Sequence, residues 1–174
     1  PMTPNSLNAI PAEARPQISA EDQARAGVYA LFGALLRDRP TESVLAFARG
    51  LEPAGGRDDF ALAWEGVRLA AAQVTLAELD DEFHALFVGL GRGELVPYGS
   101  WYQTGFLMEK PLGDLRDDLR VLGFERQPGV HEPEDHVAAL CEVMAELATD
   151  PRVSVETERG FFRNSKENGK VEKN

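Results

Sequence analysis

The stretch Val137-Ala138-Ala139-Leu140-Cys141-Glu142-Val143-Met144-Ala145-Glu146-Leu147 places apolar residues at the spacing of one helix face. Val137, Leu140, Cys141, Met144 and Leu147 recur every three or four residues, which is the period of an amphipathic α-helix. Pro133, just upstream, suits the first turn of a helix, where its missing N–H costs nothing. We therefore predict an amphipathic helix that begins near Pro133 and runs to about Leu147.

The same spacing recurs along nearly the whole chain, without a convincing two-residue alternation and without an internal repeat. The other apolar stripes are Val28, Leu31, Phe32 and Leu35; Val44, Leu45 and Ala48; Phe60, Trp64, Val67, Ala71 and Val74; Leu76, Leu79, Phe83, Leu86, Phe87 and Leu90; and Leu112, Leu115, Leu119 and Leu122. The sequence predicts an all-α fold, a single-domain helical bundle of about seven or eight helices. The expected organisation is a disordered lead-in over residues 1–18, a helical domain over 19–162 and an atypical tail over 163–174.

Helix boundaries are marked by capping residues. Thr75-Leu76-Ala77-Glu78 and Ser100-Trp101-Tyr102-Gln103 both match the capping box, in which two side chains satisfy free backbone N–H groups at a helix start. The second box predicts a helix from Ser100 to about Glu109. Other expected boundaries are Ser19 and Thr41 as N-caps, Pro111 as a helix start, Gly123 as a helix stop, and Asp150-Pro151 as the start of a last helix through Phe162.

Composition limits the classes of protein to consider. The 174 residues suffice for one domain with its own core, and the net charge of −11 argues against a nucleic-acid partner. The single cysteine, Cys141, excludes a disulfide framework and a thiolate zinc cluster, and it suits a reducing cytoplasm. No apolar run approaches the roughly 18 residues needed for stable membrane insertion. The acidic surface either favours a cationic partner or serves only solubility.

The end of the chain differs in composition from the rest. Thirteen arginines and one lysine precede residue 163, whereas residues 164–174 contain three lysines and three asparagines. We expect this tail to be poorly anchored, and no fold prediction rests on it.

The segment His131-Glu132-Pro133-Glu134-Asp135-His136 is the first of two polar clusters. Its histidines are five residues apart and would point roughly 140° away from each other on a helix, so it does not match the HExxH zinc motif. Helix capping explains the three carboxylates, which complement the positive end of a helix. Capping does not require His136, and an Asp-His pair also offers an anionic acceptor beside a switchable donor.

The second cluster is Pro97-Tyr98-Gly99-Ser100-Trp101-Tyr102, at a loop-to-helix junction. Its three aromatic rings suit either core packing or the wall of a recognition groove. No other segment offers chemistry. The glycines of Gly89–Gly93 lack the lysine and hydroxyl of a phosphate-binding loop, and Cys141 falls on an apolar stripe. The sequence thus predicts no metal, no cofactor and no catalytic residues.

Together the two clusters resemble the hallmarks of the TorD/DmsD/NarJ-type chaperones, which mature molybdenum-containing redox enzymes. In that family a Pro-Tyr-x-Ser-x-Tyr-like segment is followed about thirty residues later by a Glu-Pro-x-Asp-His helix start. Residues 97–102 and 132–136 match these segments, in the same order. The stretches Pro111–Arg116, Leu122-Gly123 and Phe83–Phe87 also look like the family. The wording of Gly89–Gly93 and of Tyr98–Leu107 looks closest to members associated with formate dehydrogenase.

The resemblance implies a cytoplasmic, all-helical chaperone and not an enzyme. Such a chaperone binds the twin-arginine signal peptide or the apoenzyme of a molybdenum-cofactor oxidoreductase, here expected to be a formate dehydrogenase, until the cofactor is inserted. One alternative is a NarJ-like assembly factor that binds the catalytic subunit independently of a signal peptide. Another is a hydrolase that uses His136 with Asp135 or Glu132.

Combined with residue chemistry, the resemblance also assigns roles. The aromatic side chains are expected to line an apolar groove for the signal, the carboxylates to bind its guanidinium groups, and His136 to orient Asp135. The expected peptide-binding residues are Phe83, Phe87, Pro97, Tyr98, Ser100, Trp101, Tyr102, Glu132, Glu134, Asp135 and His136.

One departure from the family bears on oligomeric state. The family usually continues after its Phe-Phe pair with a His-Leu-x-Pro-Trp-like segment and a closing helix, whereas Phe161-Phe162 here runs into the tail. We expect a monomer or a homodimer, because an unclosed apolar surface favours dimerisation or helix exchange.

Overall fold

The computed structural model describes residues 18–52, 59–89 and 93–167, and the described residues are helical without a strand. The helices are α1 (Ala20–Arg37), α2 (Glu42–Arg49), α3 (Asp59–Gln73), α4 (Leu76–Phe83), a π-helix (His84–Val88), α5 (Gly99–Thr104), α6 (Lys110–Val121), α7 (Val137–Thr149) and α8 (Val155–Glu167). The predicted all-α fold is confirmed. The predicted lead-in (1–17), Leu90 and the last tail residues (168–174) lie outside the described residues.

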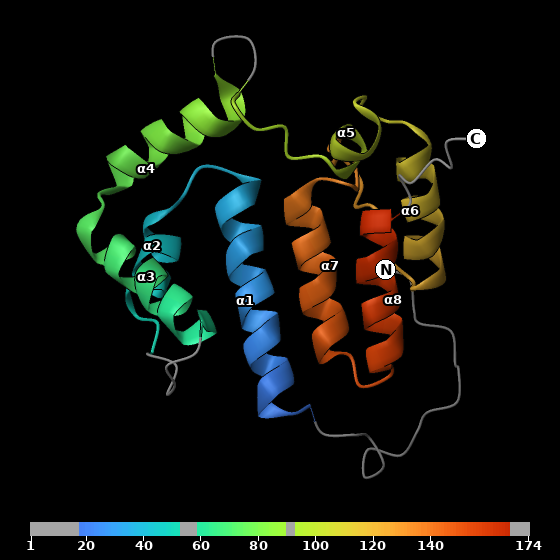
Figure 1. Cartoon of the computed structure of the whole chain (residues 1–174), viewed down its shortest axis with the longest axis horizontal. Coiled ribbons are helices and arrows are strands. Elements are labelled where there is room, and N and C mark those ends of the chain that lie inside the picture. The colour runs from blue at the N-terminus through green and yellow to red at the C-terminus, as the bar shows by residue number, and fades with distance from the viewer. Residues whose placement is uncertain (1–17, 53–58, 90–92, 168–174) are drawn as a thin grey trace.

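Four helices form the body of the molecule. Figure 1 shows α1, α7, α8 and α6 side by side, with α5 across one end of the group. The shorter helices α2, α3 and α4 lie on the other side of α1. The loop that enters α7 and the segment that enters α5 meet at the same end of the body, which is where the two sequence clusters lie.

The main core is built by the predicted stripes of three helices. Leu112, Leu115 and Leu119 of α6 pack with Met144 and Leu147 of α7, and Phe161 of α8 completes the cluster. Burial of such side chains contributes roughly 1.5–3 kcal/mol each. The periodic spacing therefore identified the inward faces of α6 and α7 correctly.

Helix α1 packs along α7 because small residues meet where the two helices approach. Ala138 is fully buried, and a Cβ placed on Gly33 would already be 3.5 Å from the Ala138 carbonyl oxygen. Leu31 of α1 is buried, as predicted. Phe32 was expected on the same face but is exposed, because it lies about 100° around the helix from Leu31.

A smaller core joins the short helices. Leu45 and Ala48 of α2 are buried with Ala71 of α3. Phe60 was predicted on the inward stripe of α3, but it is exposed and stacks on Trp64 with ring centroids 5.8 Å apart. The stripe is right in period, but this small cluster offers too little cover for its first turn.

Helix α4 starts at the predicted capping box. The Thr75 hydroxyl accepts the N–H of Glu78, and the Glu78 carboxylate accepts the N–H of Thr75 at 2.8 Å. The helix then widens into the π-helix and stops at Gly89, whose φ of 60° favours glycine. Neither segment has a fully buried residue, so the predicted stripe from Leu76 to Phe87 is only partly covered.

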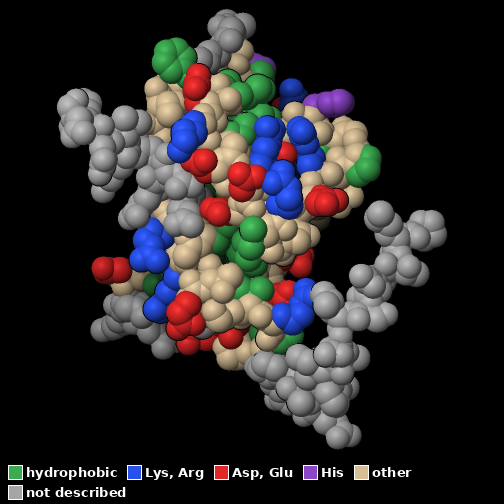
Figure 2. Space-filling model, turned by 90° about the vertical axis from the view of Figure 1, so that its right-hand side faces the viewer, with side chains coloured by type: hydrophobic (Ala, Val, Ile, Leu, Met, Phe, Trp, Pro, Cys, Tyr) green, Lys and Arg blue, Asp and Glu red, His purple; other side chains and the backbone are tan. Residues whose placement is uncertain are grey.

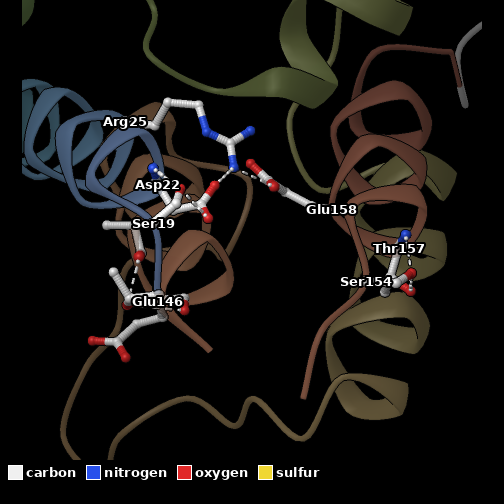
Figure 3. A network of polar contacts seen from close by, with 9 residues as sticks. Ser19, Asp22, Arg25, Glu146, Ser154, Thr157 and Glu158 are labelled. Carbon is white, nitrogen blue, oxygen red and sulfur yellow. Dashed lines mark hydrogen bonds and ion pairs between the residues drawn. The ribbon is translucent and has the colours of Figure 1, made fainter. Parts of the chain in front are cut away.

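The last helix starts later than predicted. Asp150 ends α7, and α8 begins at Val155 after the Ser154 hydroxyl accepts the N–H of Thr157. Figure 3 shows Arg25 of α1 reaching to Glu158 of α8, with 3.0 Å between the Arg25 Nη2 and Glu158 Oε2 atoms. Helix α8 continues to Glu167, beyond the predicted end at Phe162.

Within the described ranges, no helix has the length and apolar character required to cross a bilayer. Figure 2 shows one side of the molecule, on which basic and acidic side chains are interspersed around exposed apolar ones. On that side the net charge is spread and does not form a single acidic patch.

Candidate functional site

The two clusters singled out in the sequence lie against each other. Tyr98 and His136 form an isolated antiparallel bridge. The N–H of Gly99 donates to the Asp135 carbonyl at 2.9 Å, and the N–H of Val137 donates to the Pro97 carbonyl at 2.8 Å. The predicted association of the Pro97–Tyr102 and Glu132–His136 segments thus becomes a pair of hydrogen-bonded loops.

Asp135 fixes the start of α5 from across this junction. Its Oδ2 atom accepts the N–H of Ser100 at 2.8 Å, and Asp135 and Ser100 are only 4% and 1% exposed. The prediction that the Ser100 side chain caps its own helix is wrong, because Tyr98 is the N-cap residue and Asp135 supplies the acceptor. Helix α5 also ends at Thr104 and not at Glu109, since Gly105 turns the chain with a φ of 81°.

His136 performs the capping role at the start of α7. Its Nδ1 atom accepts the N–H of Ala138 at 3.1 Å, and its backbone is extended. The prediction that α7 begins near Pro133 is wrong, because the bridge to Pro97 and Gly99 keeps residues before Val137 out of the helix. The carboxylates of Glu132 to Asp135 therefore precede the helix.

The imidazole of His136 is a neutral group in this setting. Burial lowers the pKa of His136 below its ordinary value, against the opposing effect of the Glu132 and Asp135 carboxylates. The Nδ1 lone pair is used by Ala138, so the ring proton resides on Nε2. The ring also meets the Tyr98 ring edge to face, with centroids 5.2 Å apart.

Tyr98 links the junction to its outermost carboxylate. Its hydroxyl donates a hydrogen bond to Glu132 Oε1. Burial, and then the hydrogen bond and charge of Glu132, raise the pKa of Tyr98, so the phenol remains a donor at neutral pH. Glu132 is exposed and, among the described residues, belongs to no ion pair.

The three predicted recognition carboxylates therefore have three different environments. Glu134 is held by Arg116 at 2.9 Å and by Arg126 at 3.4 Å. Burial alone would raise the pKa of Glu134, but the hydrogen bond from Arg116 and the two arginine charges outweigh it and lower the pKa. Asp135 is buried in a structural contact. Glu132 alone of the three presents its carboxylate to solvent without a described cation.

A groove of about 840 Å³ opens beside Glu132 and Glu134. Its floor is apolar and its rim carries both charges, and the residues come from the end of α1, from α6 and α7, and from the loop between them. Leu119, Phe124, Val130 and Val143 contribute apolar surface, and Arg37, Arg116, Arg120, Arg126, Glu125, Glu142 and Glu146 contribute charge. The predicted aromatic residues do not belong to the described lining, so the aromatic groove expected from the sequence does not form there.

The predicted aromatic residues instead divide between two places. Phe83 and Phe87 contact each other, with ring centroids 5.0 Å apart, in α4 and the π-helix. Tyr98 lies in the junction, Trp101 is half-buried and Tyr102 is exposed. In Figure 1 the π-helix and α5 stand at the two ends of the connecting segment 94–98. Phe83 and Phe87 are thus not drawn into the Tyr98 junction.

Sequence reasoning missed Phe124, Val130 and Arg126 of the groove. These residues lie in the irregular loop between α6 and α7, where no helical period marks an inward side. Arg116 belongs to a stretch that resembled the family, but its partner Glu134 is known only from the fold. The described residues contain no group of three or more His, Cys, Asp or Glu that is placed to hold a metal ion.

Fold and site together define an all-helical protein with a polar-aromatic site built by two paired loops. The family model described as the nitrate reductase delta subunit matches residues 54–167, and the chain belongs to this family. The match confirms the resemblance to the TorD/DmsD/NarJ-type proteins.

Two similar proteins are both named chaperone protein TorD. The one from Vibrio cholerae serotype O1 (strain O395) is 35% identical over 82 residues, which is 47% of this chain and 37% of the relative. The one from Aliivibrio fischeri is 28% identical over 109 residues, which is 62% of this chain and 44% of the relative. The matched part of the chain thus spans about two fifths of the length of these curated relatives.

A similar solved structure is assigned as a redox enzyme maturation protein from Archaeoglobus fulgidus. It is 21% identical in sequence, with a TM-score of 0.49, and the match covers 82% of this chain and 91% of that one.

Proposed function

We propose that this protein is a cytoplasmic chaperone that matures a molybdenum-containing redox enzyme. The client is a formate dehydrogenase, and the chaperone binds its twin-arginine signal peptide at the junction of the two loops until the cofactor is inserted. Membership of the family and the names of the TorD relatives support the class of function. The wording of Tyr98–Leu107 supports the choice of client.

The observation that carries the signal-peptide proposal is the position of Glu132. Its carboxylate is exposed, is oriented by the Tyr98 hydroxyl and has no described cation partner. A guanidinium group presents donors that match a carboxylate in two parallel hydrogen bonds, which a lysine ammonium cannot reproduce. Glu132 is therefore the residue that reads the arginine pair, in place of the three carboxylates expected from the sequence.

The charge of the whole chain supports the same partner. A net charge of −11 attracts a basic peptide and raises its rate of encounter. Asp135 and His136 contribute indirectly, because they hold the loops that present Tyr98 and Glu132. These structural contacts weigh against a hydrolase in which the same two residues act on a substrate.

The test is calorimetric titration with the twin-arginine signal peptide of a formate dehydrogenase and with a Lys-Lys version of it. We expect the wild type to bind the Arg-Arg peptide about tenfold more tightly, and Glu132→Gln to lose most of this difference. Glu52→Gln, at an exposed position after α2, is the matched control that keeps the preference. Equal binding of both peptides by the wild type would sink the proposal.

The family description favours one alternative, since it names a subunit of an enzyme and no signal peptide. In that alternative the chain binds the client's catalytic subunit independently of its signal. A pull-down with the client, with and without its signal peptide, separates the two proposals. Retention of the signal-less client together with equal peptide affinities supports the alternative.

A further inference from the structure

Four exposed apolar side chains follow one another at the end of α5. Tyr102, Phe106, Leu107 and Met108 are 68%, 67%, 46% and 69% exposed, and we call them the apolar shelf. Exposed apolar side chains that gather in one place mark a contact site in soluble proteins, whereas single ones are ordinary. The shelf is therefore a candidate surface for a partner.

The shelf closes the longest uncharged stretch of the chain. Leu95 to Met108 are fourteen consecutive residues without Asp, Glu, Lys or Arg, in a sequence that is 27% charged. Charge returns directly afterwards at Glu109 and Lys110. A surface without charge penalises a polar partner, which would lose water without gaining a hydrogen bond or an ion pair. The shelf thus selects an apolar partner.

The chain holds the shelf in a defined shape. The Thr104 hydroxyl donates to the Ser100 carbonyl at 3.0 Å and accepts the N–H of Phe106 at 3.2 Å. Gly105 turns the chain with a φ of 81°, and Met108 has a φ of 60°, which is uncommon outside glycine. A strained, hydrogen-bonded turn that displays its apolar side chains outward is preorganised for binding.

The shelf continues from the junction that presents Glu132. Tyr98 is the N-cap of α5 and donates to Glu132, and Tyr102 follows one helical turn later, a rise of about 6 Å. Phe106 and Met108 come after the turn at Gly105. The order along the surface is a carboxylate, two phenol rings and then apolar side chains.

We propose that the apolar shelf binds the uncharged apolar stretch that follows the arginine pair of the client signal. This inference rests on the proposed function and adds a second binding surface to it. The order of carboxylate and shelf matches the order of arginines and apolar residues in such a signal. The flexible side chain of Met108 lets the surface accept apolar stretches of different sequence.

The test uses the double variant Phe106→Gln/Met108→Gln, with Val121→Gln as the control. Val121 is an equally exposed apolar residue at the end of α6, away from the shelf. The probes are two synthetic peptides with the same Arg-Arg pair, followed either by about ten leucine and alanine residues or by as many glycine and serine residues. Titrations at several temperatures give affinity and the heat-capacity change of binding, which is negative when apolar surface is buried.

We expect the double variant to bind the apolar peptide about tenfold more weakly and with a smaller heat-capacity change. Its affinity for the glycine-serine peptide and its preference for Arg-Arg over Lys-Lys should not change. Val121→Gln should behave as the wild type.

Two results would overturn the inference while the proposed function stands. The first is an unchanged affinity of the double variant for the apolar peptide, with the Arg-Arg preference intact. The second is loss of self-association in sedimentation with unchanged peptide affinity, which assigns the shelf to a second copy of the chain. A wild type that ignores the arginine pair overturns the proposed function itself.

Discussion

The carboxylate of Asp135 accepts the backbone N–H of Ser100 at 2.8 Å and so caps a helix that begins more than thirty residues earlier. The Asp135 carbonyl accepts the neighbouring N–H of Gly99. One buried residue thus satisfies two consecutive free donors at the start of α5 and locks the Tyr98 loop against the His136 loop. The second carboxylate atom, Oδ1, is buried without a partner among the described residues.

We expect Asp135→Ala to destabilise the fold by roughly 2–3 kcal/mol, because it removes a buried cap and leaves the N–H of Ser100 unsatisfied. Urea unfolding measures the change. Asp117→Ala, which removes an exposed ion pair with Arg120, is the control and should cost less than about 0.5 kcal/mol. An Asp135→Ala variant that is fully stable but binds no signal would instead make Asp135 a direct recognition residue.

The two capping boxes found in the sequence should respond differently to alanine. The Ser100 hydroxyl is buried without a described partner, so Ser100→Ala should change stability by less than about 1 kcal/mol in either direction. Thr75→Ala breaks a complete capping box and should cost about 1–2 kcal/mol. Both values come from the same denaturant titrations. Equal losses at the two positions would contradict the assignment of the α5 cap to Asp135.

The contrast between these boxes shows where sequence reasoning fails. Thr75 and Glu78 are close in the chain, so their contact depends on local geometry alone, and the motif predicts it correctly. Ser100 begins the same motif, but a buried carboxylate from another loop takes the N–H that a local cap would use. The motif cannot reveal a partner that only the fold brings near.

The same distinction applies to the fold and the candidate site. The inward faces of α6 and α7 follow from helical period, because their apolar residues meet in one large core. Phe60 breaks the pattern where the core is thin. The chemical character of the two clusters was evident from their residues, whereas the division of roles among Glu132, Glu134 and Asp135 depends on Arg116, Tyr98 and Ser100.

Acidification should weaken the fold through His136. Burial lowers the pKa of His136, so between that lowered pKa and its ordinary value near 6.5 the unfolded chain binds more protons than the folded one. The contribution of His136 is therefore neutral above pH 6.5, and stability falls as the pH drops below it. His136→Asn keeps an acceptor at the N-cap, removes the titration and should flatten unfolding free energy between pH 5 and 7.

The control for this pH profile is His131→Asn, since His131 is exposed in the loop before α7. This variant should retain the pH dependence of the wild type. A profile that stays equally steep in His136→Asn would assign the acid sensitivity to another group.

The ion pair between α1 and α8 should show the cost of an isolated buried charge. The Glu158 side chain is 6% exposed and has Arg25 as its described ion-pair partner, at 3.0 Å (Figure 3). We expect Arg25→Met to cost roughly 2–3 kcal/mol in urea unfolding, because it strands a buried carboxylate. The double variant Arg25→Met/Glu158→Met removes both charges and should recover most of this loss. Asp22→Asn leaves the pair in place and should cost less than about 1 kcal/mol, although Asp22 also binds Arg25. If the double variant is no more stable than Arg25→Met, the stability lost in Arg25→Met belongs to packing between the two helices and not to the stranded charge.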